Sequence, residues 1–357
     1  MITAKCANCK KTYRIPKERL PDGKKVSFSC PNCKERIVLD LRSPHPHMTP
    51  FQPPFSDAEE QPRSQSISPS GTSPHDTQQL RDRIERSIKD IPFMPQVVIK
   101  AQKAMADSNT GGKELSRILQ TDQAIVSSML KIANSAYYGL SGKVSSIEKA
   151  CVILGHQTVK DLVLTTGVSN LLGKKMKGYG FDSGELWMHS MATAIASKMI
   201  ATKSIPELAD DAYLAGLLHD AGKIILDPYI LEHKKAFDLF LADGDHTNLD
   251  GEKYVLGLDH ADIASEICKK WNIPKEVTTA IQNHHHPSAS GGHPLSYVVH
   301  TGDYVARLCG LGYEEDDILY EMEKDAMEFL NLNREILGNM MLKVLEAVQH
   351  IGQALKS

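Results

Sequence analysis

The sequence lacks any apolar run that approaches the roughly 20 residues of a membrane-spanning helix. It also lacks an apolar segment near its start, MITAKCANCKK, where a secretory signal would carry one. No segment repeats at a fixed period, so a repeat architecture is not indicated. We therefore expect a cytoplasmic protein without membrane contact, whose seven cysteines do not form disulfides in a reducing compartment.

The chain lacks a large excess of either charge sign, since its net charge is only −3. The charges are nevertheless unevenly distributed along the sequence. Residues 1–42 carry eleven Lys/Arg and four Asp/Glu, which gives +7 and leaves −10 for the remainder. A basic head on an acidic body is consistent with a nucleic-acid partner for the head. It is equally consistent with simple solvation or with docking of the head on its own body.

Residues 1–42 contain two CxxC pairs, Cys6–Cys9 and Cys30–Cys33, separated by short alternating segments that predict strands. Four thiolates at this spacing suit a closed tetrahedral zinc site, which would supply the folding energy that so small a piece lacks. Four free thiols or a redox pair are the alternatives. The stretch resembles the small zinc ribbon found at the N-terminus of many bacterial regulatory proteins, and this resemblance implies structural Zn²⁺ without catalysis.

The rest of the chain divides by composition into three parts. Residues 43–78 hold eight prolines and seven serines without a helical or strand period, which predicts a disordered linker. Residues 79–310 show apolar residues at helical spacing, and we predict an all-α body. Residues 311–357 form a helical extension that ends in an amphipathic helix, which we expect to pack on that body.

Histidine and aspartate recur at helical positions in the second half of the body. A single histidine in a helix is more often an ordinary core or surface residue, but the order H…HD…H…HH…D on successive helices is hard to reach by chance. Such donors suit Mn, Fe, Zn, Ni or Mg, and Lys223, one predicted helical turn after His219, would assist a phosphate. The candidate ligands are His189, His219, Asp220, His260, His284, His285 and Asp303.

The segment ANSAYYG, residues 133–139, stands apart from these histidines. We interpret Asn134–Gly139 as the end of a helix, where small groups allow close packing and Gly139 adopts a left-handed cap. A ligand site at this turn is the alternative interpretation.

The body resembles the HD superfamily of metal-dependent phosphohydrolases, and more closely its HDOD branch, the HD-related output domain of bacterial signalling. The resemblance rests on "LQTDQAIVSSMLKIANSAYYG", "SIEKACVILG", "GLLHDAGKIIL" and "AIQNHHHP". It implies His189, His219, Asp220 and Asp303 as ligands of a first divalent metal, and Lys223 as the lysine of the HDxGK signature. It further implies His260, His284 and His285 as the second-metal histidines of the cyclic-di-GMP phosphodiesterase branch, HD-GYP.

One departure from that branch concerns the segment after HHHP, which reads SASGGHPLSY and contains no DGxGYP element. HDOD domains are regarded as regulatory modules, so we expect a non-catalytic signalling output protein that binds a protein partner or a small signalling ligand. The alternative is a metal-dependent phosphohydrolase acting on a nucleotide or a phosphodiester.

Overall fold

The structure is a computed structural model of the whole chain, and it divides into two compact units, residues 1–67 and 68–357. It describes residues 2–5, 11–15, 25–29, 32, 36–40, 74–91, 94–106, 110–140, 142–242, 246–311 and 322–356. The predicted linker lies almost wholly outside these residues, as do all four predicted zinc cysteines.

The first unit contains two antiparallel hairpins. Strand β1 (Ile2–Lys5) pairs with β2 (Thr12–Ile15), and β3 (Lys25–Ser29) pairs with β4 (Arg36–Asp40). The predicted strand segments KTYRIP and KVSFS therefore lie in β2 and β3. The register places Lys5 opposite Thr12 and Ser29 opposite Arg36, so along the chain each CxxC pair falls between the two strands of one hairpin.

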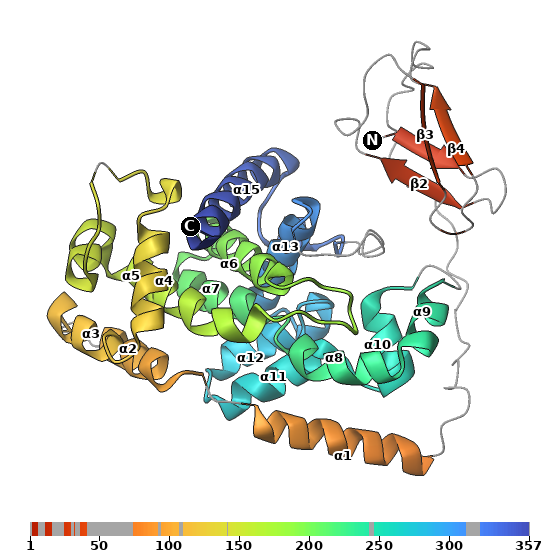
Figure 1. Cartoon of the computed structure of the whole chain (residues 1–357), viewed down its shortest axis with the longest axis horizontal. Helices are drawn as coiled ribbons and strands as arrows, with labels where there is room; N and C mark the ends of the chain where they lie inside the picture. Colours follow the sequence, from red (N-terminus) through yellow and green to blue (C-terminus); the bar gives the residue numbers. More distant parts are fainter. Residues whose placement is uncertain are drawn as a thin grey trace. The chain divides into compact units, whose positions relative to one another are not determined.

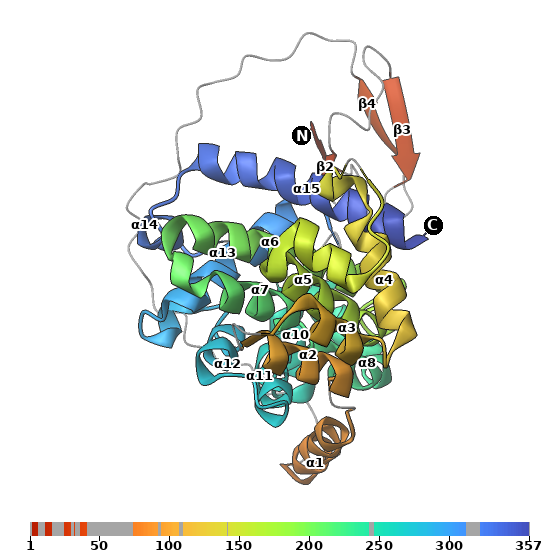
Figure 2. The ribbon, with the colours of Figure 1, turned by 90° about the vertical axis from the view of Figure 1, so that its left-hand side faces the viewer.

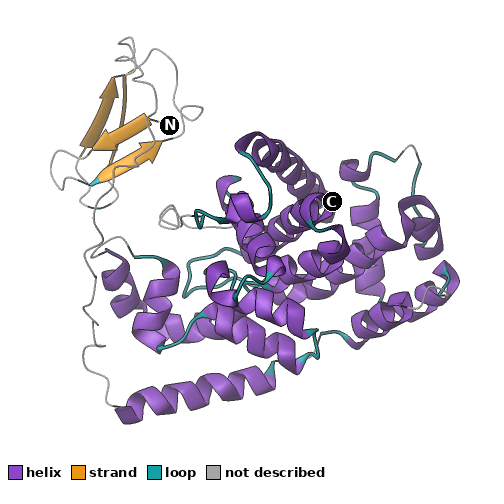
Figure 3. Cartoon of the chain, turned by 180° about the vertical axis from the view of Figure 1, so that it is seen from behind, coloured by secondary structure: helices purple, strands orange, loops and turns teal. Residues whose placement is uncertain are grey.

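In its described part the second unit is built from helices joined by loops, with one isolated β-bridge between Met176 and Phe181, which confirms the prediction of an all-α body (Figure 3). None of the described helices is long and apolar enough to cross a membrane. The helices of this unit, with the 3-10 turns left aside, are α1 (Pro74–Asp90), α2 (Gln96–Ala106), α3 (Gly112–Leu119), α4 (Gln123–Ala133), α5 (Ile147–Leu172), α6 (Glu185–Ser204), α7 (Ala209–Leu218), α8 (Gly222–Glu232), α9 (Lys234–Ala242), α10 (Asn248–Leu256), α11 (His260–Lys270), α12 (Lys275–Gln282), α13 (Pro294–Leu308), α14 (Ala326–Phe329) and α15 (Arg334–Lys356).

Helix α6 is the central helix of this unit, and it packs most closely against α7 and α13 (Figure 1). The sequence of α6 explains its central position. Small and apolar residues occupy most faces of this helix, and thirteen of its residues are buried. Helix α15 lies across α6 and α13, as Figure 2 shows, so the C-terminal extension packs on the body as predicted.

The chain does not form the continuous helix that we predicted through His219 and Lys223. Helix α7 ends at Leu218, His219 caps it, and α8 begins only at Gly222. Gly222, the first residue of α8, allows this helix to approach α11 closely, because a Cβ atom there would overlap the carbonyl oxygen of His260. The interruption turns two neighbouring side chains, those of His219 and Asp220, toward one centre.

The turn after α4 has the predicted helix-ending form. Asn134 caps α4, a 3-10 turn η2 (Ala136–Tyr138) follows, and Gly139 adopts the left-handed conformation at φ +56°. The amide of Asn134 donates to the carbonyl of Val144, and its side-chain oxygen accepts from the Val144 N–H, each at 2.8 Å. These two bonds fix the loop that follows the turn to the end of α4.

Candidate functional site

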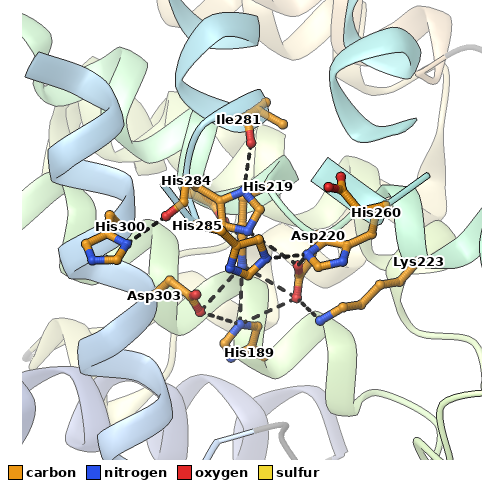
Figure 4. Close-up of polar contacts among 12 residues, drawn as sticks. His189, His219, Asp220, Lys223, His260, Ile281, His284, His285, His300 and Asp303 are labelled. Atoms are coloured by element: carbon orange, nitrogen blue, oxygen red, sulfur yellow. Dashed lines mark hydrogen bonds and ion pairs between the residues drawn. The ribbon is translucent and has the colours of Figure 1, made fainter. Parts of the chain in front are cut away.

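The predicted ligand residues come together at one buried centre, although together they span more than 100 residues of the sequence (Figure 4). His189 projects from α6, His219 and Asp220 from the α7–α8 turn, and Asp303 from α13. The other three are His260, the first residue of α11, and His284 and His285, which follow the end of α12. All seven side chains are at most 6% exposed, so the centre is shielded from bulk water.

The first half of the centre joins His189, His219, Asp220 and Asp303. The Nε2 atom of His189 lies 3.3 Å from Nε2 of His219, 3.6 Å from Oδ2 of Asp220 and 3.0 Å from Oδ1 of Asp303. The Nε2 atom of His219 lies 3.5 Å from Oδ2 of Asp220 and 3.7 Å from Oδ1 of Asp303. Four donor atoms thus face one small volume.

The opposite nitrogens of these two rings decide their tautomers. The Nδ1 atom of His189 contacts the carbonyl oxygen of Leu311 at 3.1 Å, and that of His219 contacts the carbonyl oxygen of Gly216 at 2.8 Å. A carbonyl oxygen only accepts, so each Nδ1 carries the proton, and a neutral ring then presents a bare lone pair at Nε2. The Nε2 atoms of both rings lie 3.3 Å apart and face the two aspartates, an arrangement that either a metal ion or a proton donated to Asp303 satisfies, so the donor set fits a metal ion.

The second half of the centre joins His260, His284 and His285, and Asp220 connects it to the first. Oδ1 of Asp220 lies 3.1 Å from Nε2 of His260 and 3.9 Å from Nε2 of His284. Nε2 of His285 lies 2.8 Å from Nε2 of His260. One carboxylate therefore faces both halves, with Oδ2 toward the first and Oδ1 toward the second.

Protonation in the second half follows from burial and from the neighbouring charges. Burial, and then the adjacent imidazoles, holds the pKa of His284 and of His285 well below its usual range, so both rings are in the neutral, metal-binding form. Burial also acts to lower the pKa of His260, but the carboxylates of Glu252 and Asp220 outweigh it and raise the pKa to about 9.

Two cations bind the two aspartates of the centre. Lys223 Nζ donates to Oδ2 of Asp220 at 2.8 Å, and Arg307 Nε donates to both oxygens of Asp303, at 3.0 Å each. Burial acts to raise the pKa of both carboxyls, but His219 and Lys223 hold that of Asp220, and Arg307 that of Asp303, well below the usual range. Both aspartates are therefore ionised.

The sequence reasoning missed three residues that support the centre. Glu252 is fully buried on α10, accepts from the backbone N–H and from Nδ1 of His260 at 2.7 Å, and also accepts from the hydroxyl of Tyr179 at 2.8 Å. No spacing rule points to Glu252 or Tyr179, because the chain turns between α10 and α11. Arg307 follows Asp303 by four residues on one helix, a spacing that could have identified the pair.

The remaining histidines of this region separate clearly from the ligand set. The side chain of His286 is 64% exposed and lies outside the centre. His300 is buried but faces away from the centre; its Nδ1 donates to the carbonyl oxygen of His284 at 2.8 Å, and its Nε2 accepts from the N–H of Glu323. His300 therefore fixes the backbone that carries His284.

Comparison with solved structures shows the same fold in several bacterial proteins. A candidate phosphohydrolase of Shewanella amazonensis SB2B is 21% identical, covers 76% of this chain and 98% of its own, and has a TM-score of 0.60. An HDOD domain protein of unknown function from Geobacter sulfurreducens is 21% identical over 78% of this chain and 97% of its own, with a TM-score of 0.58. A signal-transduction candidate from Marinobacter aquaeolei VT8 has a TM-score of 0.60 at 21% identity, and covers 79% of this chain and 66% of its own.

Comparison of sequences adds a relative and a family. An uncharacterised protein of Treponema pallidum (strain Nichols) is 23% identical over 210 residues, and this chain spans about 40% of that protein's length. The HDOD domain family matches residues 91–287, which is more than half of the chain. The described helices, the buried His/Asp centre and this match agree, and the chain belongs to the HDOD domain family.

Proposed function

We propose that the chain is a signalling output module whose His/Asp centre binds a divalent transition metal for a structural or regulatory purpose. His189, His219, Asp220 and Asp303 would hold the first ion, and His260, His284 and His285, with Asp220 shared, would hold a second. The observation that carries metal binding is the convergence of the Nε2 atoms of His189 and His219, 3.3 Å apart, on the same volume as the two aspartates, while each Nδ1 faces a carbonyl oxygen.

The charge balance supports a cation in this centre. Three buried carboxyl groups, those of Asp220, Glu252 and Asp303, face two permanently cationic side chains, Lys223 and Arg307. The remaining negative charge is compensated by the proton of His260, whose pKa is raised to about 9, or by a metal ion that would replace that proton, because uncompensated buried charge is costly.

The same two cations favour a binding role over catalysis. Arg307 takes both oxygens of Asp303, and Lys223 takes the Asp220 oxygen that faces the first half, so both acidic ligands are already partly neutralised. A catalytic ion needs an accessible position for water or substrate, whereas the donors here are at most 6% exposed. These features fit an ion held within a rigid signalling domain.

A metal-dependent phosphohydrolase is the second candidate, and the complete set of donors favours it. A metal at such a centre lowers the pKa of its bound water and polarises a phosphoryl oxygen. Lys223 would then release Asp220 and bind a phosphate oxygen of a nucleotide or phosphodiester. Glu252 would keep the His260 ring oriented through its Nδ1 proton.

We further propose that Cys6, Cys9, Cys30 and Cys33 bind structural Zn²⁺. The support is the matched spacing of the two pairs, each of which lies between two paired strands along the chain. With this zinc ribbon, the proposed organisation is a ribbon over 1–42, a linker over 43–78, the HDOD body over 79–310 and the extension over 311–357.

The partners and the compartment are proposals of the same kind. We propose a cytoplasmic protein that passes its signal to a protein partner. The +7 head offers a second contact, with nucleic acid, and such binding would weaken steeply with salt.

Metal content measured by plasma mass spectrometry tests the proposal on the full chain, purified without chelator. We expect zinc plus one or two further metal equivalents. His219→Gln should lose metal from the body and Cys6→Ser/Cys9→Ser should lose one zinc, whereas the matched control His286→Ala, an exposed neighbour, should lose none. Circular dichroism of each variant separates loss of metal from loss of fold.

Turnover decides between the two candidates. The metal-loaded chain is incubated with bis(p-nitrophenyl) phosphate and with a panel of nucleotides in the presence of Mn²⁺. No turnover at full metal occupancy supports the output module. Turnover that His219→Gln and Lys223→Met abolish, while His286→Ala retains it, supports the phosphohydrolase. A body that binds no metal in any preparation contradicts both.

A further inference from the structure

A second cavity lies away from the His/Asp centre, between η2, α5, α6, α7 and the C-terminal helix α15. Its volume is about 420 Å³, and it opens to solvent. Three tyrosines and three lysines line it, namely Tyr137, Tyr138, Tyr213, Lys198, Lys203 and Lys343. We call it the tyrosine pocket. None of the seven proposed metal ligands lines it.

The tyrosine pocket is a hollow open to solvent, and its size suits a small molecule. A volume of about 420 Å³ lies within the range of small-molecule sites, roughly 300–1,000 Å³. Part of its wall is α15, which lies outside the HDOD match at residues 91–287, so the C-terminal extension completes the pocket.

The walls of the tyrosine pocket favour a flat ring. Tyr137 and Tyr138 stand edge to face with ring centroids 4.8 Å apart, and Tyr137 keeps 40% of its surface exposed. Met199 of α6 and Met340 of α15 also line the pocket. Aromatic rings and methionine sulfur both make favourable contacts with a planar ring.

The hydrogen-bonding groups of these tyrosines are available to a ligand. Neither phenol of Tyr137 or Tyr138 makes a hydrogen bond with another described residue. Burial raises the pKa of both phenols, so they stay protonated at neutral pH and act as donors. Two neutral donors beside a ring favour an acceptor-rich ligand.

The charge of the pocket favours an anion. Lys198 donates to Asp161 at 2.6 Å, and this pair neutralises itself inside the pocket. Lys203 of α6 and Lys343 of α15 are exposed at the rim, and neither forms an ion pair with another described residue. The pocket therefore has two uncompensated positive charges, one on each of two facing helices.

We propose that the tyrosine pocket binds a small organic anion with a planar ring, of the size of a nucleoside monophosphate. The ring lies against the tyrosines and methionines, and the anionic group contacts Lys203 and Lys343. Since one lysine belongs to α6 and the other to α15, the bound anion links the C-terminal extension to the body. The ligand contacts Tyr137 and Tyr138 of the ANSAYYG turn, so this turn binds a ligand in addition to packing the helices.

Isothermal titration of the full chain with AMP and GMP tests this inference, with adenosine and inorganic phosphate as partial ligands. We expect a nucleotide to bind at least tenfold more tightly than either part alone. Lys203→Glu and Lys343→Glu should each weaken binding at least tenfold, because each reverses one rim charge. The matched control Lys235→Glu, an exposed lysine on α9, should bind within twofold of the native chain.

Hydrogen exchange locates the ligand independently of these variants. Bound nucleotide should slow the exchange of amides in residues 136–138 and 334–356 more than in α11 and α13. The inference is overturned if neither nucleotide binds at millimolar concentration, if both rim variants bind as the native chain does, or if protection is confined to the His/Asp centre.

Discussion

Replacing Glu252 with glutamine tests how the second half of the centre is supported. The Glu252 carboxylate is fully buried and accepts from the His260 backbone N–H, from His260 Nδ1 and from the Tyr179 hydroxyl. A glutamine keeps the volume but replaces one oxygen with an NH₂ group, which donates. At least one of the three donors then loses its acceptor, and the others lose a charged one.

The expected cost of Glu252→Gln follows from these bonds. A hydrogen bond to a charged acceptor contributes about 1.5–3 kcal/mol, and a buried donor left without an acceptor adds to the cost. We therefore expect the free energy of unfolding to fall by about 2–4 kcal/mol. For a unit of this size, such a loss lowers Tm by roughly 3–7 °C. A second effect is on metal, since loss of such a supporting bond reduces affinity by about 10- to 100-fold.

Thermal unfolding of chelator-treated protein measures the first effect of Glu252→Gln, and equilibrium dialysis against Zn²⁺ or Mn²⁺ measures the second. Glu266→Gln is the matched control, because Glu266 is an exposed residue of α11 whose partner is Lys269. Its Tm should change little, since exposed ion pairs contribute little. An unchanged Tm for Glu252→Gln, together with native metal affinity, would refute the role of this residue.

Three further predictions concern packing, pH and charge. Gly222→Ala should destabilise the chain by about 2–4 kcal/mol in urea unfolding, because α8 must then move away from α11. Gly338→Ala, where nothing lies within 4 Å of the added Cβ, should stabilise the chain by about 0.5–1 kcal/mol. Equal effects of the two substitutions would contradict the close approach of α8 to α11. Burial raises the pKa of Asp161 from 3.8 to about 6. The stability of the native chain relative to Asp161→Asn should therefore be highest below pH 4 and should decrease by about 3 kcal/mol as the pH rises from 4 through 6. A stability difference that urea titrations find constant with pH would contradict this prediction. Arg307→Met should lower Tm, because it removes the cation from a buried ion pair with Asp303. The same substitution should raise metal affinity in dialysis, because it releases the Asp303 carboxylate. Lower metal affinity in a folded variant would show that the arginine supports the ion.

The candidate ligand residues could be predicted because they stand out in short local segments of the sequence. The HD dipeptide, the HHH run and the isolated His189 and Asp303 are unusual in an apolar helical sequence, and the structure brings all of them except His286 to one centre. The all-α body was predictable for a similar reason, since apolar residues recur at the helical period through most of residues 79–357.

The break between α7 and α8 was not predictable from that period. Leu218 and Ile224 continue an apolar pattern across the break, and no proline interrupts it. The break accompanies the close approach of α8 to α11 at Gly222, and that approach depends on how the helices pack. The same holds for Glu252, whose role depends on α10 and α11 meeting at an angle that no spacing in the sequence records.

The sequence by itself determined the family, the helical class of the body and the residues available to bind a metal. Tertiary structure decided how those residues divide: Asp220 faces both halves of the centre, Arg307 and Lys223 neutralise its acids, and His286 is left outside. It also decided that the C-terminal helix completes a pocket of tyrosines and lysines. The physical reason is that side-chain type is local, whereas distance, burial and charge pairing depend on helices that are far apart in the chain.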